Sequence, residues 1–100
     1  DISRLYSLHS QGEEIYWYYG ARTPILSRDI AHELAAASGY AVSSPSGMAS
    51  HGGFKDWFIE SFGRPGFTLE IGRGANPLPI GELDEIYAKL APALSLALVM

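Results

Sequence analysis

Hydrophobic and polar residues alternate over residues 67–71, which read Phe-Thr-Leu-Glu-Ile. Alternation of this kind predicts a strand with one buried and one polar face, and the Pro-Gly pair before it predicts a turn. A carboxylate near the end of a short buried strand costs free energy unless it is paired or has a catalytic task. Glu70 is therefore a candidate functional residue. The alternative is a glutamate that simply reaches solvent.

Other periodicities predict further strands and helices along the chain. Aromatic and β-branched residues indicate strands at 2–9 and 14–19. Apolar residues at helical spacing predict helices at 28–38, 54–62 and 81–98. About three strands alternating with three helices indicate an α/β layer around a parallel or mixed sheet.

Local signals add detail to two of these elements. Ser27 is predicted to cap the helix at 28–38, and Gly39 to end it. The long segment 40–53 is rich in Ser, Gly and Pro, and we expect a loop too polar for the core. The helix at 54–62 is predicted to pack through its aromatic side chains and to expose its charged ones. These two sets are Phe54, Trp57, Phe58 and Phe62, against Lys55, Asp56 and Glu60.

Composition narrows the class of protein. With 47% hydrophobic and 18% charged residues, the chain of 100 residues is expected to be globular and to form one domain or part of one. A net charge of -4 and seven scattered Lys and Arg residues argue against a nucleic-acid partner. Without cysteine, only His, Asp and Glu can bind a metal. No apolar run is long enough to predict a membrane span, and the compartment is left open. Because the chain starts almost directly in a predicted strand, we expect that it is cut from a longer one.

Three histidines are candidates for chemistry. His32 lies within a predicted helix and is interpreted as structural, whereas His51 lies among glycines, where substrate contact and solvation are both open. His9 differs because it ends a strand and is followed by Ser10, a turn and two carboxylates. Those carboxylates, Glu13 and Glu14, are adjacent and should point to opposite faces of a strand, so at most one can reach a site beside His9.

Three segments together carry a resemblance to a known family. They are Leu-His-Ser-Gln-Gly-Glu at 8–13, Gly-Phe-Lys-Asp-Trp-Phe at 53–58 and Phe-Thr-Leu-Glu-Ile-Gly at 67–72. In this order and spacing they resemble the zinc carboxypeptidase family. The closest likeness is to its bacterial branch, which cleaves the γ-D-glutamyl to diamino acid bond of peptidoglycan peptides. The resemblance covers nearly all of the chain and implies a fragment of the family's mixed-sheet α/β domain.

The resemblance implies roles for individual residues. His9 matches the last of three zinc ligands, and Glu70 matches the general base that activates the water held by the zinc. Ser10 is carried over as a substrate-binding residue. Lys55 falls at the bottom of the specificity pocket, where its cation would suit a diaminopimelate carboxylate. The alternative is that Lys55 is a solvated helix residue beside an aspartate.

Two departures from the family pattern stand out. The first two zinc ligands come from an upstream His-x-x-Glu motif that this sequence lacks, so the chain resembles the C-terminal part of a catalytic domain, with its remaining zinc ligands elsewhere. Met48 occupies the position of the family's mobile tyrosine, and we expect His51 to supply a hydrogen-bond donor instead.

Two functions stay open at this point. In the first, the chain is part of a zinc peptidase that acts on peptidoglycan peptides, and we expect the isolated fragment to be inactive. Endopeptidase and carboxypeptidase activities are not distinguished. In the second, it is a non-catalytic binding or structural half-domain that holds no metal. In either case, exposed strand edges would favour self-association of the fragment.

Overall fold

The structure is a computed structural model that describes residues 2–43 and 53–100. This part of the chain contains a four-stranded mixed sheet and three α-helices, which confirms the predicted α/β class. The strands are β1 (Leu5–Ser10), β2 (Glu14–Tyr16), β3 (Ala41–Val42) and β4 (Gly66–Ile71). The helices are α1 (Leu26–Ser38), α2 (Phe54–Phe62) and α3 (Leu83–Ala97), and short 3-10 turns lie at Gly20–Arg22 and Ile80–Glu82.

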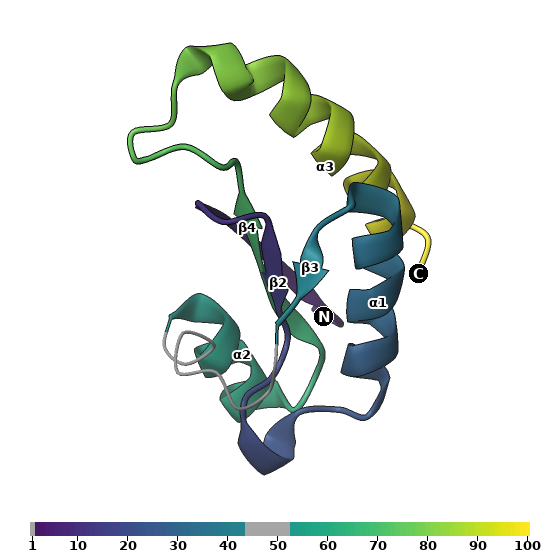
Figure 1. Cartoon of the computed structure of the whole chain (residues 1–100). Coiled ribbons are helices and arrows are strands. Elements are labelled where there is room, and N and C mark those ends of the chain that lie inside the picture. Colours follow the sequence, from purple (N-terminus) through teal and green to yellow (C-terminus); the bar gives the residue numbers. More distant parts are fainter. Residues whose placement is uncertain (1, 44–52) are drawn as a thin grey trace.

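The strands are arranged in the order β1-β4-β2-β3. β1 runs parallel to β4, β2 runs antiparallel to β4, and β3 runs parallel to β2. Helices α1 and α3 lie side by side on one face of the sheet, while α2 lies on the other (Figure 1). The sheet is therefore the middle layer of three.

The hydrophobic core lies between the sheet and the layer of α1 and α3. Alternate residues of β2 and β4 point to this side, as the 67–71 pattern predicts. Helices α1 and α3 supply the opposing apolar side chains. The buried core residues are Ile15, Trp17, Ile30, Ala31, Leu34, Tyr40, Phe67, Leu69 and Ala93.

The segment after Gly39 does not match the predicted polar loop. Tyr40 is buried at 4% exposure, and β3 follows it at Ala41–Val42. The backbone N–H groups of Ala41 and Ser43 donate to the carbonyl oxygens of Glu13 and Ile15, at 3.1 and 2.9 Å. The prediction was wrong here because strand pairing with β2, a contact distant in sequence, extends the sheet by a two-residue strand.

Helix α1 begins two residues earlier than predicted. Its N-cap is Ile25, and Ser27 lies inside the helix with a fully buried side chain, so the predicted serine cap is wrong. The helix ends at Gly39, as predicted. Gly39 has a φ of 80°, in the left-handed region that glycine adopts readily, and its N–H donates to the Ala35 carbonyl at 2.8 Å.

Helix α2 has the predicted bounds, but the side of the helix that faces the sheet is largely opposite to the predicted one. Its buried residues are Lys55, Asp56, Phe58 and Ile59. Phe54, Trp57 and Phe62, expected in the core, are each about half exposed, and Trp57 contacts the other two rings. A physical reason lies in Gly66 of β4. A Cβ at this position would lie 3.2 Å from Phe58 and 3.3 Å from Ile59, so a larger residue would push this side of α2 slightly away from the sheet.

Candidate functional site

Polar side chains line the face of the sheet opposite the core. They alternate with the buried residues of β4 and β2 and continue across β1, because residues paired in register share a face. His9 and Glu14 are the register partners of Glu70 on its two neighbouring strands. These side chains form what we call the polar row: Ser7, His9, Glu14, Tyr16, Thr68 and Glu70.

Glu70 lies at the centre of the polar row. Its side chain is 16% exposed, and Oε2 lies 3.8 Å from Nδ1 of His9, whose side chain is 70% exposed. Burial raises the pKa of the Glu70 carboxyl above its usual value, and the neighbouring charge of Glu14 adds to this increase, whereas His9 opposes it. A carboxylate with a raised pKa beside an accessible imidazole suits a role in proton transfer.

Glu14 and Tyr16 also belong to this site; the sequence left open whether Glu13 or Glu14 reaches it and did not single out Tyr16. The Tyr16 hydroxyl donates to Oε1 of Glu14 at 3.1 Å. Burial, followed by the charge of Glu14, raises the pKa of Tyr16. The signal in the sequence is weak, because alternation at 14 and 16 shows a polar face but not that this face adjoins Glu70.

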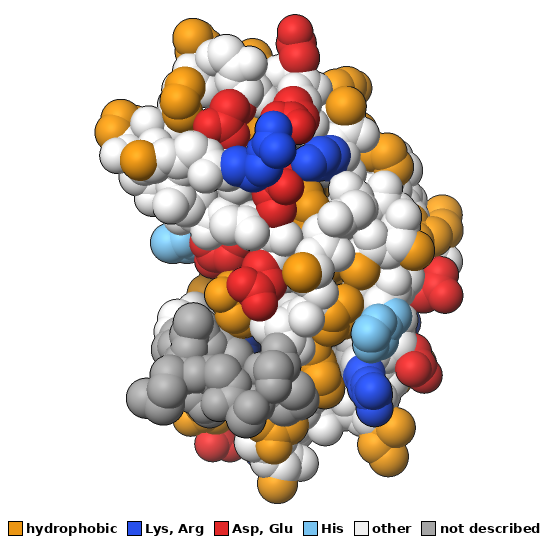
Figure 2. Space-filling view, in the orientation of Figure 1, with side chains coloured by type: hydrophobic (Ala, Val, Ile, Leu, Met, Phe, Trp, Pro, Cys, Tyr) orange, Lys and Arg blue, Asp and Glu red, His pale blue; other side chains and the backbone are white. Residues whose placement is uncertain are grey.

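Glu13 and Glu14 point apart as predicted, although Glu13 lies in the turn before β2, with a φ of 50°, and not in the strand itself. Glu14 faces the polar row, whereas both oxygens of Glu13 accept hydrogen bonds from Nζ of Lys89 on α3, at 3.1 and 2.9 Å. Lys89 also lies 3.6 Å from Glu85, which pairs with Arg73 at 2.7 Å. Acidic and basic side chains accordingly gather over α3 and the loop before it (Figure 2). Of the two adjacent carboxylates, only Glu14 reaches the polar row, because Glu13 is paired with Lys89 on α3.

Ser10 follows His9 at the end of β1, and its side chain points to the other face. Its hydroxyl donates to Oδ1 of Asn76 at 2.8 Å, which connects the end of β1 to the loop after β4. A contact between Ser10 and substrate stays a prediction.

Lys55 is not the solvated helix residue of the alternative interpretation. It is 1% exposed, and its ammonium donates to the carbonyl oxygen of Tyr18 at 2.7 Å and to Oδ1 of Asp56, itself only 6% exposed. That alternative is wrong because α2 packs this side of the helix against the sheet. Substrate binding by Lys55 stays a prediction. Met48 and His51 lie outside the described residues.

The described residues supply only part of the His, Asp and Glu ligands that a zinc site requires. Within residues 2–43 and 53–100, no three His, Asp or Glu side chains come together to hold a metal ion. A zinc site needs three or four protein ligands, and the accessible imidazole of His9 is suited to be one of them. The described residues do not form a zinc site by themselves.

None of the helices in the described residues is both long and apolar enough to cross a bilayer.

Comparisons with known proteins give two relatives, while no family model matches the chain. Over 81 residues, it is 44% identical to γ-D-glutamyl-L-diamino acid endopeptidase 1 of Lysinibacillus sphaericus. Over 84 residues, it is 42% identical to the uncharacterized protein YqgT of Bacillus subtilis (strain 168). The chain is related to part of that endopeptidase. These matches include 81% and 84% of the chain but only 20% and 22% of the relatives, so the chain spans about a fifth of their length.

Proposed function

We propose that this chain is the C-terminal part of the catalytic domain of a zinc peptidase of the zinc carboxypeptidase family. The complete protein would hydrolyse γ-D-glutamyl-diamino acid bonds in bacterial cell-wall peptides. The observation that supports this most is the largely buried carboxyl of Glu70, with its raised pKa, beside the exposed His9 at the ends of paired strands. The relationship to part of an endopeptidase of this specificity supports the same substrate class.

His9 would supply one imidazole ligand to the zinc, and the remaining ligands would come from outside the described residues. When bound, the zinc would act as a Lewis acid and lower the pKa of the attacking water. Glu70 would accept a proton from this water as it adds to the amide carbonyl. It would then donate that proton to the leaving amine as the C–N bond breaks.

The surroundings of Glu70, which raise its pKa in the metal-free protein, are compatible with both halves of this cycle. A carboxylate with a pKa closer to neutrality is a stronger base, and its conjugate acid is still able to protonate the leaving amine. Glu14 contributes to this property from the neighbouring strand, with its own position held by the Tyr16 hydroxyl. Substrate contacts by Lys55 and Ser10, and by Met48 and His51 beyond the described residues, stay predictions. In this structure Lys55 is buried and the Ser10 side chain points away from the polar row, so either contact would need these side chains to move.

The full-length protein provides the test. We expect Glu70→Gln to retain zinc, measured by metal analysis after gel filtration, while lowering kcat by about 100-fold or more on a γ-D-glutamyl-diaminopimelate peptide. We expect His9→Ala to lose zinc as well as activity. Glu60→Gln is the matched control, because Glu60 is an exposed carboxylate on α2 with 61% side-chain exposure.

Two outcomes would contradict the proposal. Full activity of Glu70→Gln would exclude Glu70 as the base. A full-length wild-type protein that binds no zinc and cleaves no peptide would instead favour a non-catalytic binding or structural half-domain.

A further inference from the structure

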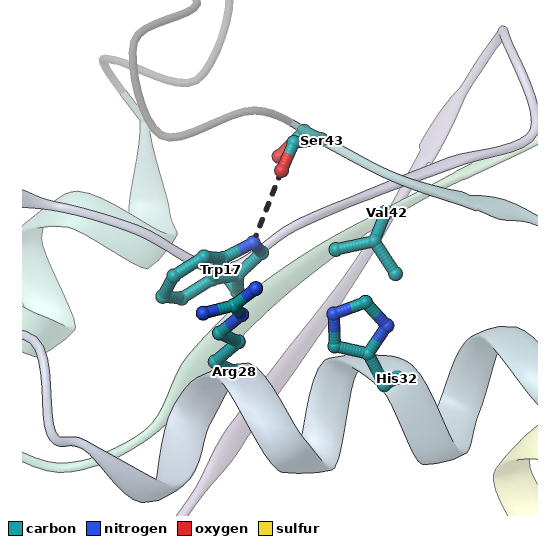
Figure 3. Close-up of a pocket in the computed structure, with 5 residues that line it drawn as sticks. All are labelled: Trp17, Arg28, His32, Val42 and Ser43. Carbon is teal, nitrogen blue, oxygen red and sulfur yellow. Dashed lines mark hydrogen bonds between the residues drawn. The ribbon is translucent and has the colours of Figure 1, made fainter.

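A pocket of about 330 Å³ lies between α1 and the edge of the sheet at β3. Its lining residues are Trp17, Arg28, His32, Val42 and Ser43. In Figure 3, the side chains of Arg28 and His32 extend from neighbouring turns of α1 toward Trp17, Val42 and Ser43. A volume near the lower end of the range for ligand sites, roughly 300–1,000 Å³, suits a small molecule.

The pocket is separate from the polar row. Ile15 and Trp17 alternate with Glu14 and Tyr16, so the indole of Trp17 points to the α1 side of the sheet and the carboxylate of Glu14 to the other. A ligand in the pocket would therefore not compete with a substrate at Glu70.

Ser43 contributes a buried hydroxyl that has no hydrogen-bond partner among the described residues. Ser43 is 5% exposed and its backbone is fixed, because its N–H donates to the Ile15 carbonyl and its own carbonyl accepts the Trp17 Nε1–H at 3.2 Å. Its hydroxyl has no hydrogen-bond partner in the described structure. An unsatisfied buried hydroxyl costs about 1–3 kcal/mol. The Ser43 oxygen is buried from solvent in this structure, so a bound acceptor would recover this cost after the side chain rotates toward the pocket.

Arg28 supplies an uncompensated positive charge. It is exposed at the pocket, and no salt bridge joins it to an acidic side chain within the described ranges. A guanidinium is charged at any physiological pH and matches the planar geometry of a carboxylate. His32, one turn further along α1, provides a ring N–H donor in either protonation state.

The remaining walls favour an apolar group attached to the anion. Trp17 and Val42 line the pocket with an indole ring and a branched aliphatic side chain. One permanent cation balances one negative charge, which favours a monoanion over a phosphate dianion. The geometry points to a binding site for a small carboxylate that carries an apolar or aromatic group. We propose this as a second ligand site, independent of the activity proposed above.

The indole N–H of Trp17 is a direct reporter for this site. In ¹H–¹⁵N spectra of the full-length protein, with the Trp17 resonance assigned through Trp17→Phe, we expect benzoate to shift this resonance saturably. Benzamide has the same shape without the charge and should shift it far less. The indole resonance of Trp57, on the exposed side of α2, serves as the internal control.

Two variants identify the groups that bind the anion. Arg28→Gln should weaken benzoate binding at least about tenfold, whereas Arg22→Gln, an exposed arginine outside the pocket, should leave it unchanged. Ser43→Ala should also weaken binding while leaving the ligand-free protein at least as resistant to urea, because it removes an unsatisfied hydroxyl.

Three results would overturn the inference. Equal shifts with benzoate and benzamide would mean that charge is not recognised. Tighter binding of inorganic phosphate than of benzoate would exclude a site for a monocarboxylate. Unchanged benzoate affinity in Arg28→Gln, with a spectrum otherwise like that of the wild type, would show that the guanidinium does not hold the anion.

Discussion

The buried pair of Lys55 and Asp56 provides the sharpest test of how α2 is held against the sheet. Lys55→Met keeps the length and apolar stem of the side chain but removes its ammonium. The carbonyl oxygen of Tyr18 then loses a charged donor at 2.7 Å, and Asp56, 6% exposed, loses a neighbouring cation. We expect this variant to be strongly destabilised.

The expected loss of stability in Lys55→Met follows from the burial of both charged side chains. A hydrogen bond to a charged group contributes about 1.5–3 kcal/mol, and removing one partner of a buried ion pair costs about 3–5 kcal/mol because the other charge stays desolvated. Replacing both charges should cost less than replacing one. In Lys55→Met/Asp56→Asn, we therefore expect at least about 2 kcal/mol of this loss to be recovered.

Urea unfolding followed by circular dichroism measures these differences, with Glu60→Gln on the exposed side of α2 as the control. A Lys55→Met variant within about 0.5 kcal/mol of the wild type would refute the reasoning, since that is the range of surface substitutions. The double variant also tests the substrate role of Lys55. If Lys55 binds a diaminopimelate carboxylate, the refolded double variant should lose its preference for diaminopimelate over lysine peptides.

Further predictions concern charges and strand edges. In the metal-free protein, Glu14→Gln should lower the pKa of Glu70 in a carboxyl NMR titration, because a neighbouring negative charge is removed; an unchanged pKa would contradict the assigned coupling. The hydrogen bond from Arg73 lowers the pKa of Glu85, so this interaction should stabilise the fold at neutral pH and be lost as the pH falls and Glu85 is protonated. Unfolding of Arg73→Gln and wild type should therefore differ at neutral pH and converge in acid; a constant difference would contradict this. The outer edge of β1 is unpaired in the described structure, and we expect the isolated 100-residue chain to self-associate through it. Sedimentation should show this association weakened by Leu8→Lys, which places a charge on the 47% exposed Leu8; a concentrated wild-type monomer would exclude it.

Local patterns predicted more of the fold than of the site. Alternation at 67–71 indicated both the strand and the polar face that carries Glu70, and Gly39 marked the end of α1. The partners of Glu70 could not be read in this way. Residues 14 and 16 adjoin it only because β2 inserts beside β4, and strand order depends on contacts distant in sequence.

Helix α2 shows why helical periodicity alone was insufficient. The aromatic side chains at 54, 57, 58 and 62 have the spacing of a core-facing stripe, and most of them are nonetheless exposed. The side that packs on the sheet carries Lys55, whose charge argues for solvent. The deciding features lie elsewhere in the chain: Gly66 permits close approach, and the Tyr18 carbonyl accepts the lysine ammonium.

The distribution of charge across the sheet links the fold to the proposed chemistry. On the α3 side, Glu13 and Glu85 are each paired with Lys89 or Arg73. On the polar row, Glu14 and Glu70 are register partners on adjacent strands, and the imidazole of His9 lies 3.8 Å from Glu70. Burial, together with the charge of Glu14, raises the pKa of Glu70 at the expense of stability. A positively charged ligand beside His9 would relieve that cost, so binding of such a ligand and stability of this half of the sheet should be coupled.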